Sequence, residues 1–532
     1  MPLRPRASYQ RILLGGTAVF AILWVTARAS VQSVTVDEAD CYLSFVEPPW
    51  PSHWTAASQN HVLNSVLMRL FTSVFGLSHL TLRAPALIGA AIYVFAAYRF
   101  CVLLTEKWIL RWAVLLCLAY NPFLMDYLVA ARGYSLAVAF LTCTVLIAAH
   151  DQIEILKGHS RSPAWACSLC SICAALSFAA NFSFAFVAAA VMLLIFIWAC
   201  RRGKSFLPLE RPTTQRVRIL TACILPGFLV TLFFSASALL RWPAGQLEGV
   251  GSTSLVETVR SIVDSSLYAL NPHLVNPLLY PVLDRLKDVL LPGLGALSAC
   301  QFFLVFRNWS SPRDALSGWL TAVASLLAGA VAVSLSVHWL SFRLFHLLLP
   351  KERTGIYLVP LCTLLAGAAA AIPVPSRLGR LCRRALTFVL LALGCYFLLC
   401  LRLTYFKEWE FNADVRSAYS VVSYFHHTHG VKDISASWLY VAPLNFYRHL
   451  SGSQTIAKFE RSPTDPTDPG FKEVHPANKQ VYVLSSVRDH DFISDQKLKV
   501  VYQGARSELV VAIRAELEGA SPRIAGRGAV PP

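Results

Sequence analysis

Apolar residues recur along the first three quarters of the chain in runs of roughly 20, separated by shorter polar stretches. A run of about 20 apolar residues is long enough for a helix to cross a bilayer. About eleven such segments are predicted, at residues 12–27, 84–104, 112–130, 133–150, 163–180, 183–200, 219–240, 290–306, 315–336, 354–373 and 385–401. The pattern therefore predicts an all-α polytopic membrane domain over residues 1–401.

The pattern changes after residue 401. Asn412–His429 has helical periodicity, and strand-like runs follow at Asp433–Val441, Gln480–Ser486, Leu498–Gln503 and Glu508–Ile513. Such a mixture predicts a small α/β domain over residues 402–518. The polar end, residues 519–532, is expected to be a disordered tail.

Composition supports a membrane protein. Only 14% of the residues are charged, against about 25% in soluble domains. The net charge of +17 could suggest a nucleic-acid partner, but the basic residues gather in alternate loops, as they do in cytoplasmic loops of membrane proteins. We therefore expect no nucleic acid as a partner, a cytoplasmic N-terminus, and residues 28–83 and 402–518 on the outer face.

The first outer loop, residues 28–83, is unusually long, and loops of that length without a function are uncommon. An amphipathic helix is predicted within it from Ser65 to Phe75, and another, in a later outer segment, from Thr253 to Leu270. Asp37 and Glu38 lie near the start of the loop among apolar neighbours. Adjacent carboxylates repel each other, so the pair is suited to a catalytic base, a metal ion or a cationic partner.

Cationic residues on the same predicted face form two further anchors. Arg132 lies between two apolar spans, where a guanidinium is costly unless it is paired. Its partner would be a carboxylate or a phosphate, which arginine binds in bidentate fashion, and snorkelling to lipid phosphate is the alternative. Lys351 and Arg353 precede a later span. Carboxylates and cations at one membrane surface suit an anionic, lipid-linked substrate.

The order of these pieces resembles the C-type glycosyltransferases of bacterial membranes, among them the dolichyl-phosphate-mannose-type, lipid A aminoarabinose-type and lipopolysaccharide galacturonic-acid-type transferases. The resemblance covers roughly residues 10–410 and is carried by Asp37-Glu38, Phe75-Gly76-Leu77-Ser78, Leu82-Arg83-Ala84-Pro85, Arg132-Gly133-Tyr134 and Lys351-Glu352-Arg353-Thr354.

The resemblance implies inverting transfer of a sugar from a polyprenyl-phosphate donor to a lipid, glycan or protein acceptor, on the outer face of a bacterial inner membrane. It implies Asp37 as general base, with Glu38 orienting it or sharing a cation. Arg132 and Arg353 would bind the donor phosphate, assisted by Tyr134 and Lys351.

One departure from the family concerns the first loop. Many relatives have a His-Pro-Pro-Leu-like run where this chain has Asn60-His61-Val62-Leu63-Asn64. His61 and Asn64, together with Arg83, are expected to shape substrate binding. No cofactor is required, and no metal ligand is assigned. Mg²⁺ or Mn²⁺ would suit the carboxylate pair, but the sequence shows no full ligand set.

Two other classes of protein are compatible with the sequence. A transporter or flippase would have repeated halves and charges near the bilayer midplane, whereas the charges here cluster at one surface and no repeat is found. A membrane-anchored assembly protein would act through its outer domain. In that case a short linker could replace residues 28–83 without loss of function.

Overall fold

The computed structural model describes residues 5–57, 59–157, 163–206, 212–241, 251–267, 270–271, 274–307, 315–432, 434–453, 455–460 and 473–520. The chain forms two compact units. The helical unit comprises Met1–Thr26, Trp54–Asn64 and Pro85–Leu401, and the mixed unit comprises Ala27–His53, Ser65–Ala84 and Arg402–Pro532. Each unit is described by itself below.

Long apolar helices make up the helical unit. The helices that lie wholly or partly in it are α1 (Pro5–Val31), α3 (Val62–Phe75), α4 (His79–Leu104), α5 (Trp108–Tyr120), α6 (Pro122–Val129), α7 (Tyr134–Leu156), α8 (Pro163–Ala180), α9 (Ala185–Phe206), α10 (Pro212–Leu240), α11 (Leu255–Ser266), α12 (Tyr280–Arg307), α13 (Ala315–Phe345), α14 (Leu358–Ala371) and α15 (Arg377–Leu399). Short 3-10 turns are η3 (Phe182–Phe184), η4 (Pro277–Leu279) and η5 (Glu352–Gly355).

Among the described residues, nine helices are long and apolar enough to cross a membrane, or ten if a bent pair counts as one span. The bent pair is α5 and α6, which meet at 52°. The bend follows from Asn121-Pro122, because Pro122 supplies no N–H and the side chain of Asn121 caps α6 by accepting from Leu124 N at 3.0 Å. The single straight span predicted at 112–130 is thus two helices.

The predicted segment at 354–373 corresponds to α14, which has only 14 residues. A helix of that length rises about 21 Å, less than the roughly 30 Å of a bilayer's hydrocarbon core. The all-α polytopic architecture predicted for this part of the chain is confirmed, although one of its segments is shorter than a full span.

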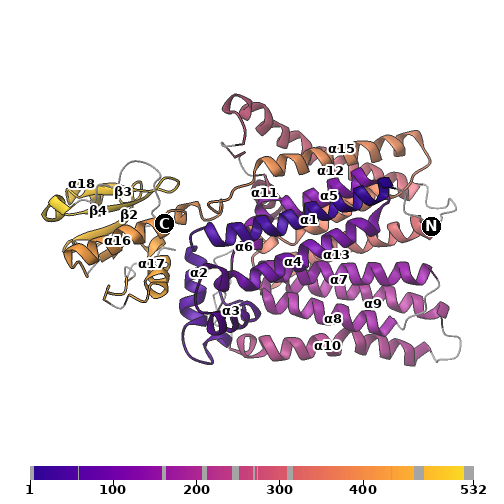
Figure 1. Ribbon diagram of the computed structural model, residues 1–532. Helices are drawn as coiled ribbons and strands as arrows, with labels where there is room; N and C mark the ends of the chain where they lie inside the picture. The colour runs from indigo at the N-terminus through magenta and orange to yellow at the C-terminus, as the bar shows by residue number, and fades with distance from the viewer. Residues whose placement is uncertain are drawn as a thin grey trace. The chain divides into compact units, whose positions relative to one another are not determined.

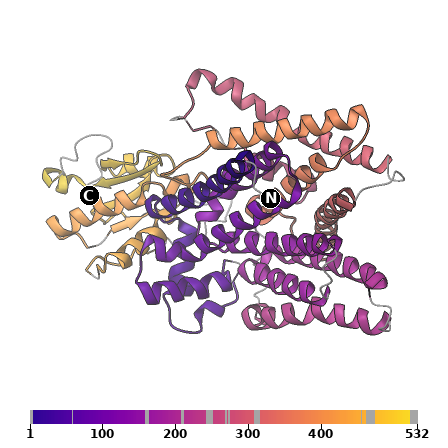
Figure 2. The ribbon, with the colours of Figure 1, turned by 45° about the vertical axis from the view of Figure 1, so that its right-hand side comes forward.

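Small residues allow the helices to approach closely. Helix α8 packs against α7 and α10, and α7 to α10 lie side by side in both ribbon views (Figures 1 and 2). A Cβ at Gly227 of α10 would come within 2.6 Å of Ser171 Oγ in α8. That hydroxyl accepts from Gly227 N at 2.9 Å and donates to Cys223 O at 2.7 Å. Contacts of this kind between small residues are typical of helices packed in membranes.

The mixed unit combines the first loop with the C-terminal region. Its elements beyond the shared helices are α2 (Val36–Cys41), the π-helical turn η1 (Tyr42–Val46), η6 (Glu410–Asn412), α16 (Val415–His429), β1 (Ile434–Ala436), α17 (Trp438–Leu450), β2 (Val481–Ser485), α18 (His490–Asp495), β3 (Lys499–Gln503), β4 (Leu509–Ile513) and η7 (Ala515–Ala520). The turn η2 (Ser52–Trp54) lies at a unit boundary. The sheet has the order β1-β2-β4-β3, with β1 parallel to β2 and the other pairs antiparallel.

Both faces of the central strands are buried. Tyr482, Leu484, Val510 and Ala512 pack with Phe492 and Ile493 of α18. Their neighbours in sequence point to the opposite face and are equally buried, and α16 contacts β4 (Figure 1). The predicted α/β character of the C-terminal region is therefore confirmed.

One predicted strand, Asp433–Val441, is mostly wrong, since only Ile434–Ala436 is a strand and α17 begins at Trp438. The carboxylate of Glu473 accepts from Ser437 Oγ and Trp438 N, both at 2.6 Å, and so provides the N-terminal cap of that helix. This cap comes from a distant residue, and tertiary contacts of that kind override strand propensity. Asp433 lies outside the described residues, as do residues 521–532 of the predicted disordered tail.

Candidate functional site

A buried cationic cluster lies in the helical unit, around His61. Its imidazole ring centroid is 5.6 Å from that of Tyr134, and His61 is 5% exposed. Burial lowers the pKa of His61 well below its usual 6.5, and the positive charges of Arg132 and Arg353 lower it further. Of the predicted substrate-binding residues, Tyr134 therefore contacts the ring of His61, and Arg132 and Arg353 lie near enough for their charges to act on it.

Gly133 determines how closely this cluster packs. It adopts a left-handed conformation with φ of 73° at the start of α7. A Cβ at this position would lie 2.1 Å from the carbonyl oxygen of Ala180 and 3.0 Å from His61 Cβ. Only glycine fits both the conformation and the space. The backbone of Ala180 and the side chain of His61 therefore approach Gly133 closely.

Several buried polar atoms of the cluster have no hydrogen-bond partner among the described residues. They include both ring nitrogens of His61 and Oδ1 of Asn64, which is 0% exposed. Asn64 is oriented by its amide nitrogen, which donates to Ala131 O at 3.1 Å. An unsatisfied buried polar atom costs about 1–3 kcal/mol, so these atoms are suited to bind polar groups of a ligand.

Lys351 and Arg353 differ in their surroundings. Lys351 Nζ lies 3.1 Å from Glu257 Oε1 of α11, in an ion pair whose side chains are 39% and 44% exposed. Arg353, in η5, contributes positive charge at His61. The turn η5 packs tightly against α11. The backbone of Gly355 lies so close to Ile262 that a Cβ at Gly355 would be only 2.3 Å from Ile262 Cδ1. Of the two cations, Arg353 is therefore the better placed for an anion in the cluster.

The carboxylate pair lies in the mixed unit, where Glu38 is completely buried. Its backbone N donates to Thr35 Oγ1 at 3.2 Å, and its Oε2 accepts from Thr35 N at 3.0 Å, so α2 begins with a capping box. Its two oxygens also accept from Arg83, Oε1 from Nε at 2.8 Å and Oε2 from Nη2 at 2.7 Å. Both side chains are 0% exposed.

Arg83 uses every N–H that a guanidinium has. Besides the two bonds to Glu38, Nη1 donates to Ala29 O and Gln32 O, and Nη2 donates to Ser33 O, all at 2.9 Å. Arginine has five N–H donors, and all five are therefore engaged. The structure differs here from the predicted substrate-binding role of Arg83 and catalytic role of Glu38, because neither side chain has exposed surface or a spare N–H for a ligand.

Asp37 is the partly exposed member of the pair and the second residue of α2. Two side chains of the C-terminal region hold the neighbouring backbone by hydrogen bonds. Val36 N donates to Asn412 Oδ1 at 2.8 Å, and Val34 N donates to Tyr447 OH at 3.0 Å. Sequence reasoning missed Asn412 and Tyr447, and no local pattern marks them, because each lies more than 370 residues from its partner.

A cavity of about 450 Å³ also lies within the mixed unit. Its lining includes Ser30, His79, Arg416, Tyr419 and Tyr447. The two tyrosine rings stack at 6.0 Å, and Tyr419 OH is 2.7 Å from Ser451 Oγ. Aromatic faces next to hydroxyls and a guanidinium suit a sugar or phosphate group.

The described residues bring no group of three or more metal-ligating side chains together at Asp37 and Glu38. The only such group in the part of the chain that the structure describes is Glu473, His475 and Asp489, in the C-terminal region. Because both oxygens of Glu38 are held by Arg83, we do not propose Mg²⁺ or Mn²⁺ at the carboxylate pair.

Fold and composition define a multi-pass membrane protein with a C-terminal α/β domain. No protein-family profile and no curated protein matches the chain. Among solved structures it is similar to ArnT from Cupriavidus metallidurans bound to undecaprenyl phosphate, at 12% identity and a TM-score of 0.46, over 94% of this chain and 97% of that one.

Two other solved structures are similar. Arabinosyltransferase EmbB from Mycobacterium smegmatis matches at 12% identity and a TM-score of 0.43, over 70% of this chain but only 31% of the length of EmbB. The Archaeoglobus fulgidus oligosaccharyltransferase matches at 13% identity and a TM-score of 0.41, over 87% of this chain and 61% of that one. All three TM-scores are below 0.5, so the proposals below rest on the residues of this chain.

The first prediction concerns the buried pair. Glu38→Gln leaves the Arg83 guanidinium buried without a counter-charge, which is expected to lower the free energy of unfolding by about 3–5 kcal/mol. The apparent melting temperature of the full chain in detergent measures the loss. Asp37→Asn, a matched change at a partly exposed neighbour, is expected to have a much smaller effect. Equal losses from the two variants would contradict the assignment of Glu38 to the structural pair.

The second prediction concerns pH. Because the pKa of His61 is lowered in the folded state, the unfolded chain binds the extra proton below about pH 6.5. Stability is therefore expected to fall as the pH drops through this window, and His61→Gln should weaken that dependence. Melting temperatures at pH 7.5 and 5.0 test this, with His490→Gln as the control because that side chain is 76% exposed. An unchanged pH dependence in His61→Gln would contradict a buried neutral imidazole.

Proposed function

We propose that this protein is a membrane glycosyltransferase of the C type, which transfers a sugar from a polyprenyl-phosphate-linked donor to a lipid, glycan or protein acceptor with inversion. The observation that carries the proposal is the buried cluster of His61, Arg132 and Arg353, in which two guanidinium groups accompany unpartnered polar atoms. The order of motifs along the chain supports it. The outer face of a bacterial inner membrane is the proposed location of the reaction.

In this proposal the cationic cluster binds the phosphate of the donor. Arg132 and Arg353 neutralise its charge, which makes the phosphate a good leaving group without a protonated acid. The neutral imidazole of His61 can donate one hydrogen bond and accept another, and Asn64 Oδ1 can accept from a sugar hydroxyl. The ring of Tyr134 packs against that of His61 and orients it. Lys351 contributes less to phosphate binding, because it already forms an ion pair with Glu257.

The general base is assigned to Asp37, which removes the proton from the acceptor group. Of the two adjacent carboxylates, Glu38 is neutralised by Arg83, so Asp37 is the one whose side chain can reach a substrate. Anchoring of the backbone by Asn412 and Tyr447 limits its movement. General-base catalysis of this kind contributes about 10²–10⁴-fold to a rate. Glu38 and Arg83 are positioning residues in this scheme.

Transport is the alternative function. A flippase could use the same cluster to bind a lipid phosphate without cleaving any bond, and it would need no base. Measuring sugar transfer and lipid phosphate binding separately therefore distinguishes the two functions.

The third prediction tests the base. Asp37→Asn is expected to lower sugar transfer from polyprenyl-phosphate-linked donors by at least about 100-fold, because the amide cannot accept the proton. Binding of undecaprenyl phosphate by the same variant should stay within about twofold of wild type, since the base does not touch that group. Asp40→Asn, a partly exposed carboxylate on the same helix, serves as the matched control. Near-normal transfer by Asp37→Asn would exclude it as the base.

The fourth prediction tests the phosphate site. Arg132→Ala is expected to weaken binding of undecaprenyl phosphate by about 10–150-fold, the usual effect of losing a hydrogen bond to a charged group. Binding of undecaprenol, which lacks the phosphate, should not change. Arg260→Ala is the control because this arginine of α11 is 81% exposed. An equal loss for both lipids would mean that Arg132 supports the fold or contacts the chain of the lipid.

A further inference from the structure

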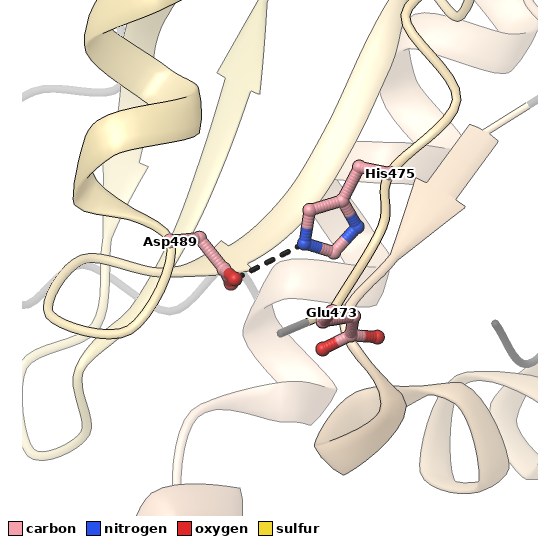
Figure 3. A group of neighbouring side chains, drawn as sticks. All are labelled: Glu473, His475 and Asp489. Atoms are coloured by element: carbon pink, nitrogen blue, oxygen red, sulfur yellow. Dashed lines mark hydrogen bonds and ion pairs between the residues drawn. The ribbon is translucent and has the colours of Figure 1, made fainter. Parts of the chain in front are cut away.

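A group of three metal-ligating side chains lies in the C-terminal α/β domain and includes none of the residues of the proposed transfer reaction. Glu473 and His475 are on the segment that leads into β2, and Asp489 precedes α18 (Figure 3). One potential ligand atom from each side chain lies within 4.8 Å of the others. His475 Nε2 is 3.0 Å from Asp489 Oδ1, and these two side chains are only 3% and 5% exposed.

Each carboxylate is already oriented by hydrogen bonds from outside the group. Glu473 accepts from Ser437 Oγ and Trp438 N, and Asp489 Oδ2 accepts from Ser485 N at 2.8 Å. A carboxylate offers about four acceptor positions, so each keeps capacity for a further partner. Bonds of this kind are what hold ligands in place around protein metal ions.

The spacing is close to that of a coordination sphere. Ligand atoms about 2.1 Å from a metal ion lie about 3.0 Å apart at a right angle and about 3.4 Å apart at a tetrahedral angle. The 3.0 Å between His475 Nε2 and Asp489 Oδ1 is a hydrogen bond in this structure, and a widening by about 0.4 Å would give the tetrahedral spacing. Since all three atoms lie within 4.8 Å, a movement of the Glu473 carboxylate by about 1–1.5 Å would complete a three-ligand site.

The charge of the group also favours a cation. It contains two carboxylates and one imidazole in a mostly buried setting. Two carboxylates in such a setting are stabilised by a nearby positive charge, which a metal ion would supply.

We propose that Glu473, His475 and Asp489 bind one divalent transition-metal ion of the zinc class. One imidazole nitrogen with two carboxylate oxygens favours zinc over Mg²⁺ and Ca²⁺, which prefer oxygen ligands alone. The ion would join the start of α17, through Glu473, to the turn between β2 and α18. Its role is to stabilise the C-terminal domain, and it is independent of the proposed sugar transfer.

The fifth prediction tests this site on the full chain in detergent, freed of metal with a chelator and titrated with ZnCl₂. We expect one zinc per chain by elemental analysis and a rise in the apparent melting temperature. Glu473→Gln and Asp489→Asn keep oxygen acceptors for the existing hydrogen bonds but lose a charged ligand. Each should weaken zinc binding by more than the roughly 10–100-fold typical of a residue that only supports a ligand.

Two controls separate this site from other histidines. The double variant His427→Ala/His429→Ala removes exposed imidazoles of α16, and His490→Ala removes another that is 76% exposed, so both should retain the tight site. The proposal is overturned if the wild type binds no zinc at micromolar concentration, or if Glu473→Gln and Asp489→Asn bind zinc as the wild type does. Loss of binding only in the α16 variant, or an equal response to MgCl₂, would also overturn it.

Discussion

The ion pair between Glu38 and Arg83 is the interaction on which the carboxylate end of the candidate site depends. Arg83 donates to the carbonyl of Ala29 in the last turn of α1 and to those of Gln32 and Ser33 just after it, and Glu38 closes the capping box at the start of α2. The last carbonyls of one helix and the first N–H groups of the next both lack partners within their helices. One buried pair therefore satisfies two helix ends, and the charges have the signs that the two helix dipoles favour.

The Glu38–Arg83 pair and the cluster around His61 differ in how completely their buried polar atoms are hydrogen-bonded. At Arg83 all five N–H groups are used and no surface is exposed, so the group is complete in itself. At His61 both ring nitrogens lack partners among the described residues, although the ring is buried beside two cations. A complete group stabilises the fold, whereas an incomplete one is suited to a ligand that completes it.

Sequence reasoning predicted the elements of this protein better than their contacts. Apolar runs located each candidate span among the described residues, because membrane helices satisfy their own backbone groups and need little tertiary information. The run at 112–130 was misread because the break at Asn121-Pro122 lies inside a continuous apolar stretch. Of the site, the sequence predicted Arg132, Tyr134 and Arg353 at the donor phosphate and His61 in the substrate pocket, but not the packing of the His61 ring against Tyr134. The pairing of Glu38 with Arg83 was not predicted, since 45 residues separate them and an arginine in a motif that resembles a transferase family suggests a ligand as readily as a counter-ion.

The neutral state of His61 matters for the proposed reaction. A sugar joined to a polyprenyl phosphate is a phosphodiester with one negative charge, and the polyprenyl phosphate released has up to two. In the proposed reaction, two guanidinium groups would therefore bind the leaving phosphate more strongly as the bond to the sugar breaks, which would lower the barrier to transfer. A third cation at His61 would strengthen binding of the product further and slow its release. Burial keeps His61 neutral, so it can position hydrogen-bonding groups of the substrate without adding to the charge that holds the product.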